Sequence, residues 1–166
     1  MSKKEKTTKT NATRLLEQAH VAHSIVTYPV DPDDLSAEHL AESAGLDIDV
    51  VYKTLVLHGD KIGHFVAVIP GAKEVDLKVA AKAAGAKKTE MIPMKELLPL
   101  TGYIRGGCSP IGMKKPFPTF IDSSALLHDI IHVSAGVRGQ QLCISPQDLI
   151  YFIKATVVEN LACDKK

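Results

Sequence analysis

Short apolar blocks recur along the chain, and several of them alternate with polar positions at the period of a β-strand. Ser24–Tyr28 alternates in this way and is rich in β-formers, which predicts a strand that ends before Pro29. Lys53–His58 and Ile62–Ile69 are strongly apolar and are separated by a polar segment that includes Gly59 and Asp60. The sequence therefore predicts an early strand followed by a β-hairpin.

Other segments have helical spacing or recognised helix start and stop signals. Ser145 and Pro146 form the strongest start, because serine is a good N-cap and proline is favoured at the first helical position. Gly45 and Gly85 stand where a helix is commonly closed by glycine. A first helix is predicted to begin with Asn11 as its N-cap. The other predicted helices are 36–44, 74–84, 94–98 (ended by Pro99) and 146–155.

Further strands are predicted at 86–91, 119–121, 130–134, 140–144 and 156–159. About seven strands and five helices are therefore intermixed, with at least one hairpin, which argues against a purely parallel sheet. We expect a mixed α/β fold, with a central mixed sheet and helices packed outside it. The 166 residues correspond to one domain, which we place at 11–160 behind a flexible basic leader at 1–10.

Composition and charge narrow the possible settings. The 45% of hydrophobic residues excludes a wholly disordered chain, and no apolar run reaches the roughly 18 residues that span a bilayer. Three cysteines at unrelated spacings indicate a reducing compartment, and we expect a cytoplasmic protein. Four Lys and one Glu in the first ten residues give +3, which leaves −2 for the rest of a chain of net charge +1. Any contact with RNA must therefore depend on a local patch, and neither DNA nor a membrane is expected as a partner.

The least ordinary segment is 101–116, which holds four glycines and two prolines. It matches neither of the standard glycine-rich nucleotide motifs. Its glycines allow a ligand to approach the backbone closely and expose N–H groups that can bind an oxyanion or a phosphate, while Pro110 stiffens the loop. The alternative is a tight connection with no ligand.

Lys53 is a single cation in the apolar run 51–57. Burial of an ammonium is costly unless it reaches water, a carboxylate or a ligand, so Lys53 is either a functional group or an edge-strand lysine that extends to solvent. The histidine pairs at 20 and 23 and at 128 and 132 lack a third ligand of the zinc-protease type, so no metal is expected. Cys108, within the glycine-rich segment, is a candidate nucleophile whose base the sequence does not reveal.

Several motifs coincide in order and spacing with those of one family. They are Tyr52-Lys53-Thr54-Leu55, TGYIRGGCSPIGMKK at 101–115, IDSSAL at 121–126, HVSAGVRG at 132–139 and ISPQDL at 144–149. Over roughly residues 11–159 the chain strongly resembles the YbaK-type bacterial Cys-tRNA(Pro) deacylases, which are free-standing relatives of the editing domain of prolyl-tRNA synthetase.

The resemblance implies a barrel-like mixed β-sheet with surrounding helices. It implies hydrolysis of cysteine mischarged onto tRNA(Pro), with Cys-tRNA(Cys) as a further candidate substrate. The reaction would occur in trans, with prolyl-tRNA synthetase as a partner, and would need no metal or cofactor. Carried over by motif position, the catalytic residues are Lys53 and Gly106, and the substrate-binding residues are Tyr28, Gly107, Ser109, Pro110 and Ser134.

No evident Ser-His-Asp set or metal site is present, so orientation and oxyanion stabilisation must supply most of the catalysis. The backbone N–H groups of Gly106 and Gly107 are candidates for holding the ester, and Lys53 for contacting a phosphate or the oxyanion. We expect the substrate's own thiol to attack its carbonyl carbon, in a lyase-like route through a cyclic thioester. Two alternatives stay open: a non-catalytic RNA- or nucleotide-binding module, and a thiol hydrolase that uses Cys108.

Overall fold

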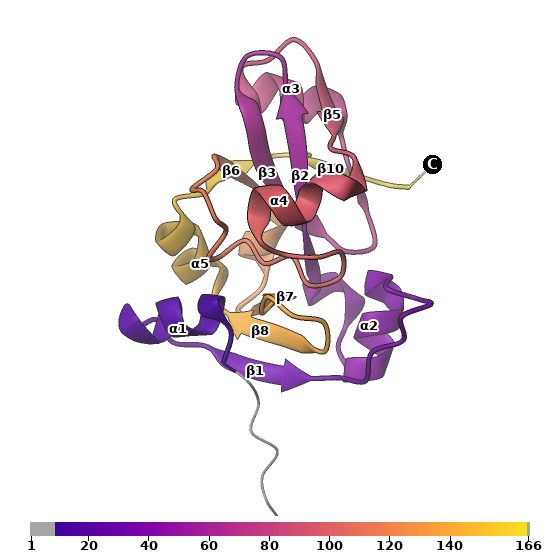
Figure 1. Ribbon diagram of the computed structural model, residues 1–166, viewed down its shortest axis with the longest axis vertical. Coiled ribbons are helices and arrows are strands. Elements are labelled where there is room, and N and C mark those ends of the chain that lie inside the picture. The colour runs from indigo at the N-terminus through magenta and orange to yellow at the C-terminus, as the bar shows by residue number, and fades with distance from the viewer. Residues whose placement is uncertain (1–8, 166) are drawn as a thin grey trace, which may run out of the picture.

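The computed structural model describes residues 9–165, and its strands divide into three sheets (Figure 1). The largest has the order β5 (Thr89–Met91), β2 (Tyr52–Gly59), β3 (Gly63–Pro70), β6 (Thr119–Asp122) and β9 (Thr156–Val158). A second has the order β1 (Ser24–Thr27), β8 (Gln140–Ile144) and β7 (Ile131–Ser134), and β10 (Ala162–Cys163) pairs with β4 (Glu74–Val75). β2 is antiparallel to β3 and β5, whereas β3–β6 and β6–β9 are parallel, so the predicted mixed pairing is confirmed.

The helices are short, and their ends carry the predicted capping residues. Ser36 and Ser145 accept hydrogen bonds from the first turns of their helices, and Gly45 and Gly85 close helices in the left-handed conformation. In residues 9–165 no helix has the length and apolarity needed to cross a membrane. The α-helices are α1 (Asn11–Gln18), α2 (Ala37–Ala44), α3 (Leu77–Ala84), α4 (Leu97–Thr101) and α5 (Pro146–Ile153), and the 3-10 helices are η1 (Ile48–Val50), η2 (Met94–Glu96) and η3 (Ser123–Leu127).

The predicted α/β class is confirmed, but the strands do not form a single barrel-like sheet of about seven. In the described part of the chain none of the three sheets is closed. The reason lies at the start of β2, where the three-stranded sheet is joined to it only by an isolated parallel bridge between Val51 and His132. A ladder does not continue from this bridge, so two open sheets meet at a corner.

Two hydrophobic cores occupy opposite faces of the five-stranded sheet. In β2, Tyr52 and Val56 face the first core and Leu57 faces the second, as the alternation of a strand requires. The first core lies between this sheet and the three-stranded sheet and includes Leu16 from α1 and Leu149 from α5. The second core also buries parts of α3, β4 and the chain before β10. Burial on both faces explains why β3 is almost continuously apolar.

Two predicted helix boundaries are wrong for local reasons. The helix predicted from Glu74 begins only at Leu77, because the Asp76 carboxylate accepts hydrogen bonds from the N–H groups of Lys78 and Val79 and so fixes the N-terminus. The preceding residues form β4 instead. Pro99 does not end the short helix near Leu98. It lies in the first turn of α4, where a proline interrupts no helical hydrogen bond.

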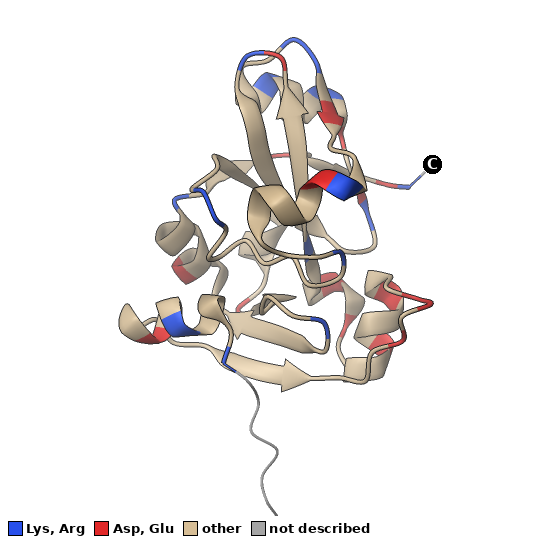
Figure 2. Cartoon of the chain, in the orientation of Figure 1, with Lys and Arg blue, Asp and Glu red and all other residues tan. Residues whose placement is uncertain are grey.

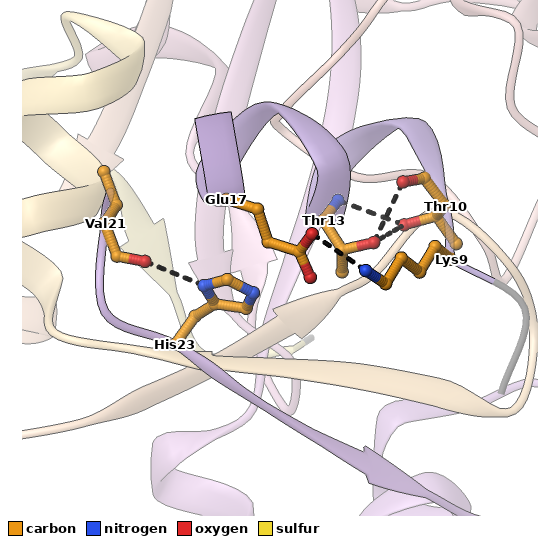
Figure 3. A network of polar contacts seen from close by, with 6 residues as sticks. All are labelled: Lys9, Thr10, Thr13, Glu17, Val21 and His23. Atoms are coloured by element: carbon orange, nitrogen blue, oxygen red, sulfur yellow. Dashed lines mark hydrogen bonds and ion pairs between the residues drawn. The ribbon is translucent and has the colours of Figure 1, made fainter. Parts of the chain in front are cut away.

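The chain before α1 contributes to the fold from residue 9 onward (Figure 3). Thr10, not Asn11, is the N-cap of α1: its Oγ1 accepts a hydrogen bond from the N–H of Thr13. Lys9 Nζ lies 3.0 Å from Glu17 Oε2 on the same helix. Of the predicted leader 1–10, residues 9 and 10 contact α1 in this way, and residues 1–8 lie outside the described residues.

Candidate functional site

A cavity of about 570 Å³ opens where the two larger sheets meet. Four segments form most of its wall: α2 with the segment before it, the first half of β2, the stretch from β5 to α4, and the start of the glycine-rich loop. Ser134 at the end of β7 and Gln141 in β8 add polar groups, whereas Leu35, Val56 and Ile92 are among its apolar lining residues. A mainly apolar cavity with a few convergent polar groups is typical of a small-molecule or cofactor site.

The cavity follows an edge of β2 that has little pairing. β5 pairs only with Leu57–Gly59, so within residues 9–165 the segment 52–55 has a neighbouring strand on the β3 side alone. Because side chains alternate along a strand, Tyr52 and Thr54 point to one face while Lys53 points to the other. All three line the cavity. The open edge therefore gives the cavity access to both faces of β2.

The other wall of the cavity is fixed by a close approach between α2 and the end of β3. A side chain at Gly71 would collide with the Cβ of Ala37, the first residue of α2. The Gly71 N–H also donates a 2.8 Å hydrogen bond to the carbonyl of Val51. Glycine at this position thus lets α2 lie against the start of β2, which brings Glu38 into the lining of the cavity.

Lys53 is half-buried in this cavity rather than extended into bulk solvent. Its pKa is lowered first by burial and then by the positive charge of Lys165, and the carboxylates of Glu38 and Glu74 oppose the shift. Glu38 itself is paired with Lys165, whose Nζ lies 3.2 Å from Oε2. The ammonium of Lys53 therefore has nearby carboxylates but no direct ion pair among the described residues, which leaves it available to an anionic ligand.

The structure brings together four of the residues predicted from the sequence and leaves three outside. Tyr28, Lys53, Gly106 and Ser134 line the cavity, whereas Gly107, Ser109 and Pro110 do not. Ser134 Oγ accepts a hydrogen bond from the N–H of Gly136, which shapes the turn between β7 and β8. Tyr28 donates its N–H to the carbonyl of Gly139. The turn between β7 and β8 therefore contacts both Tyr28 and Ser134, and it holds these two cavity residues from distant parts of the sequence near one another.

The two adjacent glycines of the loop lie close against a neighbouring segment of the protein. A Cβ on Gly107 would lie 3.2 Å from both Val137 Cα and Arg138 N, and a Cβ on Gly106, whose φ is +83°, would lie 3.2 Å from Arg138 Nε. The Gly107 N–H donates to the carbonyl of Ile104 at 2.9 Å. This N–H therefore closes a turn, and the expectation that it holds the substrate stays a prediction. The Gly106 N–H has no hydrogen-bond partner among residues 9–165.

Ser109 and Pro110 maintain the shape of the loop. Ser109 is fully buried, and its Oγ accepts a hydrogen bond from the N–H of Ile111 at 3.2 Å. Pro110 is buried and borders a separate hollow that Phe117 also lines. Gly107, Ser109 and Pro110 do not line the cavity, and their predicted role in binding substrate stays a prediction.

Two polar residues that the sequence analysis missed point to a ligand more directly. Thr54 Oγ1 and Gln141 Oε1 are buried, lack a hydrogen-bond partner in the described residues, and belong to residues that line the cavity. A buried polar atom without a partner costs about 1–3 kcal/mol, so each such atom calls for an explanation, and a ligand that binds in the cavity is one. The signal available in the sequence was weak: Gln141 is a polar residue next to the apolar positions of the predicted strand 140–144.

The cysteines and histidines do not form a second chemical centre in the cavity. Cys108 lines the cavity, but burial raises the pKa of its thiol to about 12, so it is protonated near neutral pH. Cys143 Sγ lies 3.1 Å from His132 Nδ1 on adjacent strands, and burial shifts both pKa values toward the neutral forms. Within residues 9–165, no three His, Cys, Asp or Glu side chains are grouped in a way that could hold a metal ion.

The comparison with protein families decides the assignment. The family model of the aminoacyl-tRNA editing domain matches residues 31–152, which include α2, β2, the glycine-rich loop and Gln141. The chain belongs to the aminoacyl-tRNA editing domain family. The relationship predicted from the sequence motifs is thereby confirmed, and most residues that line the cavity described above lie within the matched region.

Individual relatives agree with this assignment. The editing domain is 50% identical over 150 residues to a protein of Enterococcus faecalis (strain ATCC 700802 / V583) called "Putative Cys-tRNA(Pro)/Cys-tRNA(Cys) deacylase EbsC", covering 90% of this chain and 92% of that protein. Its fold matches the crystal structure of "a putative trans-editing enzyme for prolyl tRNA synthetase" with a TM-score of 0.78 and 23% identity, over 93% of each chain. The hypothetical protein APE2540 gives a TM-score of 0.81 at 20% identity, over 90% of this chain and 97% of that one.

Proposed function

We propose that this editing domain hydrolyses cysteine mischarged onto tRNA(Pro), with Cys-tRNA(Cys) as a second substrate. The observation that carries the proposal is a cavity lined by Lys53 and Gly106, whose ammonium and N–H lack a partner among residues 9–165, and by Thr54 and Gln141, each of which has a buried oxygen without a hydrogen-bond partner. The similarity to EbsC, at 50% identity over most of both chains, supports cysteine as the amino acid.

These groups suit an aminoacyl ester. The Gly106 N–H is a donor for the ester carbonyl, and it gains strength as negative charge develops on that oxygen. The oxygens of Thr54 and Gln141 are acceptors for the α-ammonium or the thiol of the amino acid. The Lys53 ammonium stabilises negative charge on the oxyanion or on the phosphate of the terminal nucleotide. Tyr28 and Ser134 complete the wall.

The attacking atom in this proposal is the sulfur of the substrate. A cysteine thiol with a pKa near 8.5 is a few per cent thiolate at neutral pH, and the sulfur is tethered close to its own ester carbonyl. Sulfur bonds to the carbonyl carbon, the bond to the tRNA ribose oxygen breaks, and that oxygen takes the proton that the thiol lost. Water then opens the cyclic thioester and releases cysteine. The thiol of Cys108 is supported less well, because burial raises its pKa to about 12.

The small net charge of residues 11–166 supports the idea that the domain does not select the tRNA alone. Apart from the Lys-rich first ten residues, acidic side chains exceed basic ones by two. We infer that prolyl-tRNA synthetase supplies much of the tRNA affinity and that the domain acts in trans beside it in the cytoplasm, where aminoacyl-tRNA is made. The structural likeness to a synthetase-related trans-editing enzyme, at 23% identity, supports the fold and leaves this partnership as a proposal.

A panel of tRNA(Pro) substrates carrying cysteine, serine, alanine or S-methylcysteine tests both the activity and the attacking group. Cleavage of the cysteinyl ester alone supports attack by the substrate thiol. Comparable cleavage of the alanyl or S-methylcysteinyl ester contradicts it and favours attack by water. Binding of every substrate without cleavage of any would instead support the non-catalytic RNA-binding alternative. Each reaction is run with and without prolyl-tRNA synthetase to measure its contribution to tRNA selection.

A further inference from the structure

Charge is divided unevenly around the cavity. Between Arg14 and Lys53 the chain has no Lys or Arg, and residues 31–49 contain seven carboxylates: Asp31, Asp33, Asp34, Glu38, Glu42, Asp47 and Asp49. Three of these line the cavity, namely Asp31, Asp34 and Glu38. Figure 2 shows these acidic positions gathered over α2 and the segments flanking it. RNA phosphates are repelled by such a surface, so the nucleic acid must approach the cavity from another side.

The glycine-rich loop and the turn between β7 and β8 supply that side. Arg105 and Arg138 both line the cavity, and neither forms an ion pair with a carboxylate in the described residues. Both guanidinium groups therefore lack a carboxylate partner among residues 9–165. Their lack of partners leaves them available to an anionic ligand.

The side chain of Arg138 is also held in place before any ligand binds. Its Nε donates a 2.8 Å hydrogen bond to the carbonyl of Arg105, and its side chain packs over Gly106. A guanidinium has five N–H donors, so four remain on its two terminal nitrogens. Because the side chain is already oriented, less conformational entropy is lost when these donors bind a phosphate.

We propose that Arg105 and Arg138 bind the phosphodiester that precedes the terminal adenosine of the tRNA. This inference rests on the proposed function: with the aminoacyl ester beside Gly106, the backbone of the same single-stranded 3′ end must leave the cavity near the two arginines. Arg138 is then both a positioning residue for the loop, through Nε, and a phosphate ligand through its terminal nitrogens. Arg105 is a phosphate ligand only, since its carbonyl alone supports the loop.

The test compares two substrates across three variants. Arg105→Gln and Arg138→Gln remove the proposed phosphate contacts, and Lys88→Gln, an exposed lysine before β5, is the matched control for loss of one positive charge. Deacylation is measured with Cys-tRNA(Pro) and with cysteinyl-adenosine, which carries the same ester but no phosphate. We expect both arginine variants to lose about fivefold or more of kcat/KM on the tRNA at low salt. On cysteinyl-adenosine Arg105→Gln should match the wild type, and Lys88→Gln should do so on both substrates.

The salt dependence separates a phosphate contact from a structural role. For the tRNA substrate, log kcat/KM is plotted against log salt concentration between about 50 and 200 mM KCl. In each arginine variant the slope should become shallower by the amount that corresponds to the loss of about one phosphate contact. An Arg105→Gln enzyme with unchanged kcat/KM and slope on the tRNA would overturn the inference, as would equal loss on both substrates. If the wild type cleaves neither substrate, the proposed function fails and this inference fails with it.

Discussion

Ser134 and Gln141 are cross-strand partners on β7 and β8, and both side chains line the same cavity. Ser134 Oγ is engaged with the N–H of Gly136, whereas Gln141 Oε1 has no partner in the described residues. The pair therefore contains one polar group that supports the fold and one that is available to a ligand.

Replacement of Gln141 should separate stability from activity. Gln141→Leu preserves the approximate size of the side chain and removes a buried unpartnered acceptor, so the free energy of unfolding should be unchanged or higher. We expect KM for Cys-tRNA(Pro) to rise about tenfold or more, because the substrate loses a hydrogen bond in a desolvated site. Thr54→Val is the matched variant at the other unpartnered oxygen and should behave in the same way. Urea unfolding and steady-state kinetics measure both quantities; unchanged KM in both variants would contradict a ligand role.

The alkaline limit of activity should report on Lys53. Its pKa lies below the ordinary 10.5, and activity that needs the ammonium falls as pH rises through that pKa. Lys165→Gln removes a repelling cation and releases Glu38, so it should raise the pKa of Lys53 and move the alkaline fall to higher pH. Glu38→Gln should move the fall to lower pH for the opposite reason.

The measurement is the pH profile of kcat/KM after subtraction of the spontaneous hydrolysis of the ester. Lys53→Ala serves as the reference without the ammonium: it should lose most of its activity and retain its fold to within about 1 kcal/mol, because the side chain is only half-buried. Identical alkaline limits in the Lys165 and Glu38 variants would show that another group sets this limit.

Gly107 should tolerate no side chain even though it does not line the cavity. In Gly107→Ala the new Cβ meets the backbone of Val137 and Arg138 at 3.2 Å, so one of the two segments must shift by a few tenths of an ångström. We expect a loss of about 1–3 kcal/mol of stability together with reduced activity, because the loop that carries Gly106 must shift. Gly63→Asn is a control at a turn glycine with positive φ and open space around its Cβ position, and it should leave activity unchanged. Thermal unfolding and deacylation assays give the two readouts.

Cys108 should be dispensable and unreactive. Because burial raises its pKa to about 12, almost no thiolate is present at pH 7–8, and the thiolate is the form that iodoacetamide alkylates. Cys108→Ala should keep most of the deacylase activity. Mass spectrometry of the folded wild type after iodoacetamide treatment should show Cys108 unmodified; its rapid alkylation with parallel loss of activity would restore the thiol-hydrolase alternative.

The sequence by itself determined the features whose physical causes lie within a few residues. Ser36 and Gly45 bound α2 as predicted, Ser145 and Pro146 start α5, and Gln140–Ile144 is a strand with the predicted bounds. Caps and strand alternation act over one turn or one strand, so they can be read without knowledge of the rest of the chain. The motifs around Lys53 and the glycine-rich loop also identified the family correctly, because the order and spacing of residues are properties of the chain itself.

Only the tertiary structure decided that Thr54 and Gln141 line the cavity and that Gly107, Ser109 and Pro110 do not. The neighbour of Gly107 is Val137, thirty positions away, and the partner strand of Gln141 is set by the pairing of β7 with β8 and β1. The division into open sheets likewise depends on one bridge between Val51 and His132. Such contacts join segments that are distant in the sequence, so they depend on how the whole chain packs around the five-stranded sheet rather than on local propensity.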